Sequence, residues 1–220
     1  MPMTEIPPSP SVEVIESRTM ATLYDPVLWI GEKLGMAARR RQLLAGARGA
    51  VLEIGAGTGL NLPHYPADLD AIVLAEPGVR MADHIDLDRA PAGVPVRLEQ
   101  APAEQLPFED ATFDTVVSTL VLCTVGDPER AVAEVARVLR PGGRLLFLEH
   151  VRADQGWRRG LQRRSVRAWA AFADGCQCDR ETLATIGDRL RIESCESGTW
   201  RGMPAIVKPL VWGSAVVPAA

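Results

Sequence analysis

Residues 51–59 read VLEIGAGTG, a short apolar run that leads directly into three glycines at alternate positions. An apolar run with little period-2 patterning is typical of a parallel strand that is buried on both faces. Glycines that follow such a strand allow positive φ angles and let the backbone approach a ligand closely. This stretch therefore predicts a buried strand followed by a ligand-binding turn.

The glycine spacing and a later acid narrow the kind of ligand. Dinucleotide-binding folds use G-x-G-x-x-G, whereas here the third glycine is Gly59 and the next position is Leu60. Glu76 follows a second apolar run at 71–75, at the place where a carboxylate binds both hydroxyls of a ribose. Alternatively, these are tight turns beside a solvated acid. The flanking strand and the placed acid favour a nucleoside site, and the spacing disfavours an NAD-dependent oxidoreductase.

The following sequence alternates between strand-like and helical patterns. Strand-like runs lie at 94–98, 115–121 and 144–151. Residues 128–139 place apolar side chains three and four positions apart, as a helix does, and RPGG at 140–143 stops the pattern. This alternation predicts an α/β fold, a doubly wound and mostly parallel seven-stranded sheet, Rossmann-like, with helices on both faces.

The two ends of the sequence complete this organisation. Residues 1–17 are rich in Pro and Ser and predict a mobile tail, and residues 18–220 predict a single domain. A helix is expected over 23–45, and residues 152–190 read as a helical insertion that covers the substrate. The last two strands, which follow that insertion, are expected at 189–194 and 205–211.

Composition excludes several classes of protein. The 220 residues carry a net charge of −4 and only 5% aromatic residues, so nucleic acid is not an expected partner. No apolar run is long enough to cross a bilayer, and the first residues lack the features of a secretory signal, so we expect a soluble, cytoplasmic protein. Cys176 and Cys178 lack the spacing and the second ligand pair of a structural zinc site, so no metal is expected. Oligomeric state is left open.

Three segments resemble the class I S-adenosylmethionine-dependent methyltransferases. They are LEIGAGTG at 52–59, AEQLPFEDATFDTVVSTLVLC at 103–123 and RVLRPGGRLLFLEHV at 137–151. Within this class the chain is most similar to the small bacterial ubiquinone/menaquinone-type and phospholipid N-methyltransferases. It also resembles the methyltransferase-like thiol S-methyltransferases, through TLVLCTV, LEHV and GCQCDRET. The resemblance covers roughly residues 20–200.

The resemblance implies S-adenosyl-L-methionine as the cofactor, S-adenosyl-L-homocysteine as its product, and a set of binding residues. The turn would bind the methionine part, Glu76 the ribose, Ala103 and Glu104 the adenine, and Leu120 would border the transferable methyl. The implied residues of the turn are Glu53, Gly55, Ala56, Gly57 and Gly59. Pro102 replaces an Asp that many relatives direct at the adenine, so we expect a loss of about 1 kcal/mol for one hydrogen bond.

The implied reaction is an in-line methyl transfer to a small, largely apolar acceptor, which is a thiol, a quinol or phenol, or an amine. His150, at the end of the fifth strand, is either a catalytic base or a packed strand-end histidine. Tyr24 either closes over the cofactor or packs at a helix start. A non-catalytic cofactor-binding protein is the alternative from another class.

The insertion begins with a basic stretch. Residues 152–167 hold six arginines and one acid beside an apolar stripe. This pattern indicates either a substrate lid with weak peripheral membrane contact or a solvated basic face on a covering helix.

Overall fold

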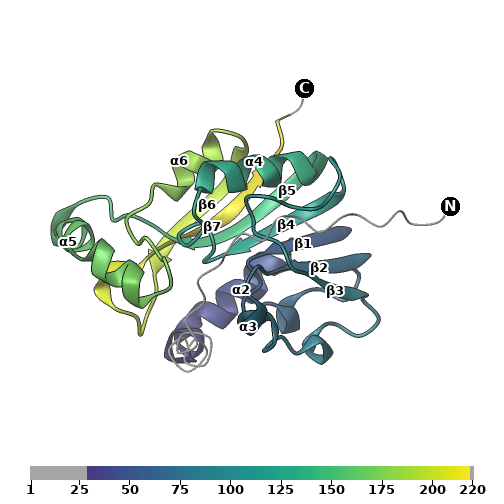
Figure 1. Ribbon diagram of the computed structural model, residues 1–220, viewed down its shortest axis with the longest axis horizontal. Coiled ribbons are helices and arrows are strands. Elements are labelled where there is room, and N and C mark those ends of the chain that lie inside the picture. Colours follow the sequence, from purple (N-terminus) through teal and green to yellow (C-terminus); the bar gives the residue numbers. More distant parts are fainter. Residues whose placement is uncertain (1–28, 219–220) are drawn as a thin grey trace.

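The computed structural model describes residues 29–218, and these form one seven-stranded sheet with the order β3-β2-β1-β4-β5-β7-β6 (Figure 1). β1 to β5 pair with one another in parallel, and β7 runs antiparallel to both β5 and β6. The strands are β1 (Ala50–Ile54), β2 (Ala71–Ala75), β3 (Val96–Glu99), β4 (Phe113–Thr119), β5 (Leu139–His150), β6 (Arg191–Thr199) and β7 (Pro209–Val216). The predicted Rossmann-like fold is confirmed.

Helices cover both faces of this sheet. One buried cluster packs α4 and α6 against the strands, and a second cluster packs the N-terminal helical segment against the opposite face (Figure 1). The helices are α2 (Ala37–Leu44), α3 (Val79–Ala82), α4 (Pro128–Val138), α5 (Gly156–Phe172) and α6 (Thr182–Gly187). A π-helical segment lies at Glu32–Met36, and short 3-10 turns lie at Leu62–His64, Leu87–Arg89 and Ala205–Val207.

α4 illustrates how local sequence sets these elements. Asp127 caps the helix by accepting a hydrogen bond from the Arg130 N–H, and Pro128 fills the first turn. Ala131, Val132, Val135 and Val138 are buried against the sheet. The helix ends at Val138, one residue before the predicted end at Leu139, and β5 begins at once with Leu139 rather than at 144. Leu139 pairs with Phe113, and the next pair is Thr115 with Arg144. The RPGG residues at 140–143 lie between these two pairs as an irregularity in the strand, and the first three of them are exposed.

Other expected boundaries shift for local reasons. The described part of the helix predicted over 23–45 contains a break at Gly35, whose φ of +126° is not helical. The strand predicted at 205–211 is wrong in its first half, because residues 205–207 form a 3-10 turn that buries Ile206 and Val207. The tail 1–17 and Tyr24 lie outside the described residues.

The insertion between β5 and β6 contains α5 and α6, as expected, and one buried side chain fixes α5. Gln162 Oε1 accepts from the Ala153 N–H at 2.8 Å, and Gln162 Nε2 donates to the carbonyls of Cys178 and Ile206, both at 2.8 Å. The Gln162 side chain is fully buried. This carboxamide therefore joins α5 to three separate segments of backbone.

The order of the strands in the sheet indicates where a ligand would bind. The order of strands reverses between β1 and β4, and in such sheets ligands bind beyond the carboxyl ends of the strands at that point. The glycine turn follows β1, Glu76 follows β2, and Leu120 follows β4. His150 is the last residue of β5, one strand further along. The fold thus gathers the predicted site residues at one edge of the sheet.

Candidate active site

The turn after β1 has the backbone shape that its glycines predict. Gly55, Gly57 and Gly59 have φ angles of +56°, +58° and +77°. The Gly57 N–H donates to Glu76 Oε2 at 2.7 Å, and the Gly78 N–H donates to Glu76 Oε1 at 2.9 Å. Glu76 therefore fastens the turn to the end of β2, which places a buried carboxylate beside the turn.

The glycines differ in what surrounds them. A Cβ on Gly55 would lie 2.7 Å from both methyl carbons of Val121, so the loop after β4 packs directly on the turn. A Cβ on Gly57 would meet nothing closer than Met81 at 3.6 Å. Ala56 is buried, and its N–H donates to the Ala75 carbonyl at 3.2 Å. A turn with glycine at every second position beside a carboxylate is a donor and acceptor set that fits a nucleoside cofactor.

A buried carboxyl group lies beneath the turn. Glu53 accepts hydrogen bonds from Tyr65 Oη at 2.7 Å and from Asn61 Nδ2 at 2.9 Å. Burial raises the pKa of Glu53 from 4.5 to about 7, although these two hydrogen bonds and the charge of Arg40 oppose the shift. The same desolvation, together with Glu53, raises the pKa of Tyr65 well above its ordinary value. Glu53 thus changes charge near neutral pH.

Arg40 extends this network toward β4. Its guanidinium donates to Asn61 Oδ1 at 2.9 Å and to Thr119 Oγ1 at 3.2 Å, and it pairs with Glu32 at 3.1 Å. Asn61 Nδ2 also donates to Thr119 Oγ1 at 2.8 Å. Together with the turn, these side chains line a cavity of about 20 Å³. No periodic pattern or motif marks Arg40 and Asn61 in the sequence, and only the fold brings them close to Glu53.

The residues expected near the adenine take different positions. Ala103 is buried. The carboxylate of Glu104 is engaged with backbone, since its Oε1 accepts from the N–H groups of Gly126 and Asp127 at 2.7 and 3.3 Å. Glu104 therefore holds the segment that leads into α4, and its contact with adenine stays a prediction.

Leu120 adopts a left-handed conformation at the end of β4. Its φ is +62°, and its N–H donates to the Leu148 carbonyl at 2.9 Å. Glu149 Oε1 accepts from Ser118 Oγ at 2.7 Å and from the Val121 N–H at 3.1 Å. Burial raises the pKa of Glu149 despite these hydrogen bonds. Glu149 thus positions the loop after β4, and no hydrogen bond joins it to His150.

His150 lies in a cluster that the sequence analysis did not assemble. His150 Nε2 lies 3.0 Å from Cys176 Sγ, and the indole N–H of Trp169 donates to the same sulfur at 3.2 Å. Cys123 packs beside them, and all three ligand-type residues are buried. Hydrogen bonds from Cys123 and His150 lower the pKa of the Cys176 thiol, whereas hydrogen bonding to Cys176 and burial raise that of Cys123.

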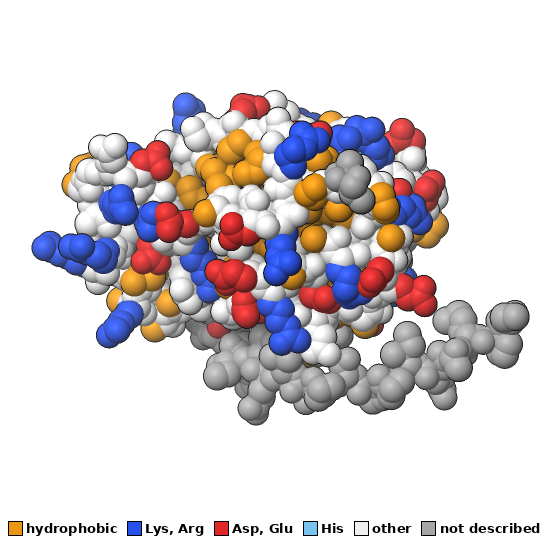
Figure 2. Space-filling model, turned by 90° about the horizontal axis from the view of Figure 1, so that it is seen from above, with side chains coloured by type: hydrophobic (Ala, Val, Ile, Leu, Met, Phe, Trp, Pro, Cys, Tyr) orange, Lys and Arg blue, Asp and Glu red, His pale blue; other side chains and the backbone are white. Residues whose placement is uncertain are grey.

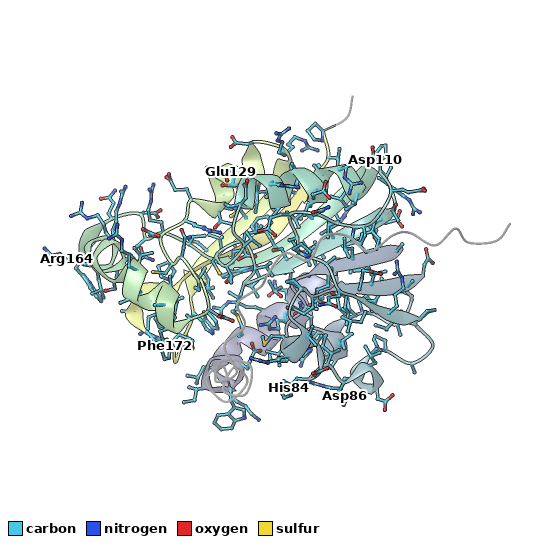
Figure 3. All side chains as sticks on the ribbon, viewed as in Figure 1. His84, Asp86, Asp110, Glu129, Arg164 and Phe172 are labelled. Carbon is cyan, nitrogen blue, oxygen red and sulfur yellow. The ribbon has the colours of Figure 1, made fainter. Side chains whose placement is uncertain are left out.

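This arrangement bears on the role expected for His150. Its Nε2 is engaged by sulfur, and its buried Nδ1 has no hydrogen-bond partner among the described residues. Cys178, which the sequence pairs with Cys176, packs in the main core cluster instead. His84 projects outward after α3 (Figure 3). The role of His150 as a base stays a prediction.

The structure has a Rossmann-like α/β fold, with a glycine-rich turn and a buried carboxylate at the switch point of its sheet. A family model described as a methyltransferase domain matches residues 52–147. The human thiol S-methyltransferase TMT1A is 30% identical over 205 residues, which cover 82% of this chain and 79% of that protein. The phosphatidylethanolamine N-methyltransferase of Cereibacter sphaeroides is 41% identical over 133 residues, which cover 56% of this chain and 63% of that protein.

A solved structure shares the fold. The N-methyltransferase NodS from Bradyrhizobium japonicum WM9, in complex with S-adenosyl-L-homocysteine, aligns with a TM-score of 0.66 at 18% identity. The alignment covers 92% of this chain and 100% of that one. The chain belongs to the S-adenosylmethionine-dependent methyltransferases, and S-adenosyl-L-methionine is its cofactor. This membership favours methyl transfer over NAD-dependent chemistry.

Proposed function

We propose that this enzyme transfers the methyl group of S-adenosyl-L-methionine to the sulfur of a small, largely apolar thiol. The observation that carries the proposal is the extent of one similarity. The relative named as a thiol S-methyltransferase matches 82% of the chain, whereas the N-methyltransferase matches 56% and a ubiquinone/menaquinone C-methyltransferase of Idiomarina loihiensis matches 45%. A match over 82% of the chain extends into the insertion at 152–190, where we expect the determinants of acceptor specificity to lie.

The surroundings of the β4 and β5 ends suit this chemistry. Leu120, Val121 and Trp169 pack against buried clusters there, so the acceptor end of the site is largely apolar. The cofactor supplies a methyl group on a positively charged sulfur. A thiolate that attacks this group loses charge as the bond forms, and an apolar pocket therefore favours the transition state over the separated ions.

A thiol acceptor needs little help from a base. Its ordinary pKa of about 8.5 leaves a reactive thiolate fraction near neutral pH, whereas a phenol at about 10 or an alkylamine must lose a proton from a far more basic group. The contribution of the protein is then alignment of acceptor and donor in a dry site, which is worth up to about 7–11 kcal/mol in favourable cases.

A matched acceptor panel tests the proposal. Alkyl thiol, alkylphenol, alkylhydroquinone and alkylamine acceptors with the same chain, together with an aminophospholipid, are incubated with S-adenosyl-L-methionine, and S-adenosyl-L-homocysteine release is measured. We expect the thiol to give the highest kcat/KM and a methyl thioether by mass spectrometry. Faster turnover of an amine or hydroquinone overturns the thiol assignment. Cofactor binding without turnover of any acceptor supports the non-catalytic alternative.

We also propose weak, peripheral contact with anionic lipid through α5. Trp157 and Phe172 are 66% and 63% exposed on this helix, and Arg164 and Phe172 point outward from it (Figure 3). Basic side chains project from this end of the molecule, with acidic ones beside them (Figure 2). Among the described residues, no helix is long and apolar enough to cross a membrane. Equal flotation with neutral and anionic liposomes contradicts this contact.

A further inference from the structure

We propose that Cys123, His150 and Cys176 form a binding site for a soft or borderline metal ion of the zinc class. Each residue offers one ligand atom, and within residues 29–218 these three atoms all lie within 4.8 Å of one another. The inference goes beyond the proposed function and does not depend on the identity of the acceptor.

The spacing of the ligand atoms matches a tetrahedral site. Zinc binds cysteine sulfur at about 2.3 Å and histidine nitrogen at about 2.0–2.1 Å, so neighbouring ligand atoms lie roughly 3.5–3.8 Å apart. The observed upper bound of 4.8 Å and the 3.0 Å between His150 Nε2 and Cys176 Sγ bracket this value. A change of at most about 1 Å in any of the three distances between ligand atoms would therefore complete the geometry.

The cluster is built by three separate parts of the chain and is fixed by backbone hydrogen bonds. Cys123 follows β4, His150 ends β5, and Cys176 follows α5. The Gln177 N–H donates to the Cys123 carbonyl at 2.8 Å, which ties the two cysteine segments together. The Cys176 N–H donates to the Ala173 carbonyl at 3.0 Å, which continues the end of α5. The ligands are thus held in place before any ion arrives.

The donor set selects the class of ion. Two sulfurs and one imidazole nitrogen suit zinc and similar ions, whereas Mg²⁺ and Ca²⁺ require oxygen ligands. The nearby Glu149 is not a competing ligand at its Oε1, which accepts from Ser118 Oγ. The indole N–H of Trp169 donates to Cys176 Sγ at 3.2 Å, an outer contact of the kind that orients metal ligands.

Three protein ligands leave a fourth coordination position for water or another exogenous donor. Such three-ligand sites, including those with two cysteines and one histidine, are the open kind of zinc site. In this role His150 uses Nε2 as a ligand and does not act as the base that the sequence suggested. Cys176 and Cys178 are close in the sequence, but in the fold Cys176 lies with Cys123 and His150, whereas Cys178 packs in the main core cluster.

Cobalt substitution tests the site on the full chain. The protein is reduced with a phosphine, freed of metal by a chelator, and titrated with Co²⁺ and then with Zn²⁺. We expect sulfur-to-cobalt charge-transfer bands and intense visible d–d bands that saturate at one equivalent and disappear when zinc is added. Elemental analysis after dialysis should show stoichiometric zinc. A failure to develop these bands overturns the proposal, whatever the acceptor panel shows.

Single-residue variants test whether the metal ion binds at this cluster. Cys123→Ser and Cys176→Ser should abolish the charge-transfer bands, and Trp169→Phe should weaken zinc binding by about 10-fold while keeping them. Cys195→Ser, which changes an exposed cysteine outside the cluster, should bind as the unchanged protein does. Circular dichroism and binding of S-adenosyl-L-homocysteine verify that each variant is folded. Bands that survive in Cys176→Ser, or that vanish in Cys195→Ser, contradict the assignment.

Discussion

The carboxylate of Glu76 accepts a hydrogen bond from the Gly57 N–H at 2.7 Å, so the end of β2 and the turn after β1 are held as one unit. The same carboxylate accepts from the Gly78 N–H at 2.9 Å. Glu76 thus shapes the turn, and its binding of ribose hydroxyls stays a prediction.

Glu76→Gln should weaken binding of S-adenosyl-L-homocysteine by about 10- to 100-fold. The amide keeps the size of the side chain but places an NH₂ group against a backbone N–H, which removes a charged hydrogen bond worth about 1.5–3 kcal/mol. Isothermal calorimetry measures the affinity. The control is Glu99→Gln, at the end of the neighbouring strand β3, where the carboxylate pairs with Arg97. Unchanged affinity for S-adenosyl-L-homocysteine in Glu76→Gln would contradict the role of Glu76 in cofactor binding.

Gly55→Ala should lower the free energy of unfolding by at least about 1 kcal/mol more than Gly57→Ala, because overpacking a well-filled site costs about 1–3 kcal/mol. The two positions have nearly equal φ angles of +56° and +58°, so the backbone strain is shared. Only at Gly55 would the added Cβ lie 2.7 Å from Val121. Urea unfolding of both variants measures the difference, and equal losses would contradict the close packing.

Stability should fall as the pH rises toward 7 through the titration of Glu53. Burial raises its pKa from 4.5 to about 7, so the folded chain holds this proton more tightly than the unfolded chain. The contribution is fully present below pH 4.5 and is lost as the pH rises through the folded value near 7. The loss amounts to as much as about 3 kcal/mol.

Glu53→Gln should reduce this dependence, because the amide does not titrate, while Glu149, whose pKa burial also raises, still contributes in the same direction. Urea unfolding at about pH 5 and about pH 8 gives the slope that linkage relates to proton uptake. Glu109→Gln, which changes an exposed carboxylate, should keep the slope of the unchanged protein. A slope that persists in Glu53→Gln would assign the effect to another group.

Arg180→Lys should loosen the loop after β4. The guanidinium donates to the carbonyls of Leu122 and Val125 at 2.5 and 2.7 Å, and an ammonium group cannot reproduce this two-pronged contact. Loss of one such hydrogen bond, at about 1.5 kcal/mol or more, should speed amide exchange in this loop by about 10-fold. Arg189→Lys, at an exposed position, serves as the control. Equal exchange in both variants would show that Arg180 does not hold the loop.

Gln162→Leu should destabilise the protein by about 3 kcal/mol or more and release α5. The substitution leaves the Ala153 N–H and the carbonyls of Cys178 and Ile206 without their buried partner. Each buried unsatisfied group costs about 1–3 kcal/mol. Hydrogen exchange along α5 measures the release, with Gln155→Leu at an exposed position as the control. Unchanged exchange in Gln162→Leu would remove the anchoring role.

Local patterns sufficed for much of the fold. The strands at 50–54 and 71–75 have the predicted bounds, because uninterrupted apolar runs between turn residues leave little choice of register. The RPGG stretch predicts the end of a helix. In the structure it also forms part of β5, and this second role depends on pairing with β4. Residues 205–207 form a 3-10 turn that buries Ile206 and Val207 in the core. The strand propensity of these residues does not predict this tertiary packing.

The site was predictable only where its residues follow a motif. The turn and Glu76 lie where the strand ends predict them. Cys123, His150 and Cys176 are far apart in the chain and meet only because β4 lies beside β5 and α5 returns across their ends. Cys178 lies two residues from Cys176 in the sequence, but it packs in the main core cluster and not with the other two cysteine and histidine ligands.

The loop after β4 is gripped at several points: Val121 lies against Gly55, the Val121 N–H bonds Glu149, and the Leu122 carbonyl bonds Arg180. Val121, which packs on the glycine turn, and Cys123, which belongs to the Cys123–His150–Cys176 cluster, lie two residues apart on this held segment. The turn and the cluster therefore share one piece of backbone. Thermodynamic reciprocity requires that any effect of a ligand at one of them on affinity at the other be the same factor in both directions.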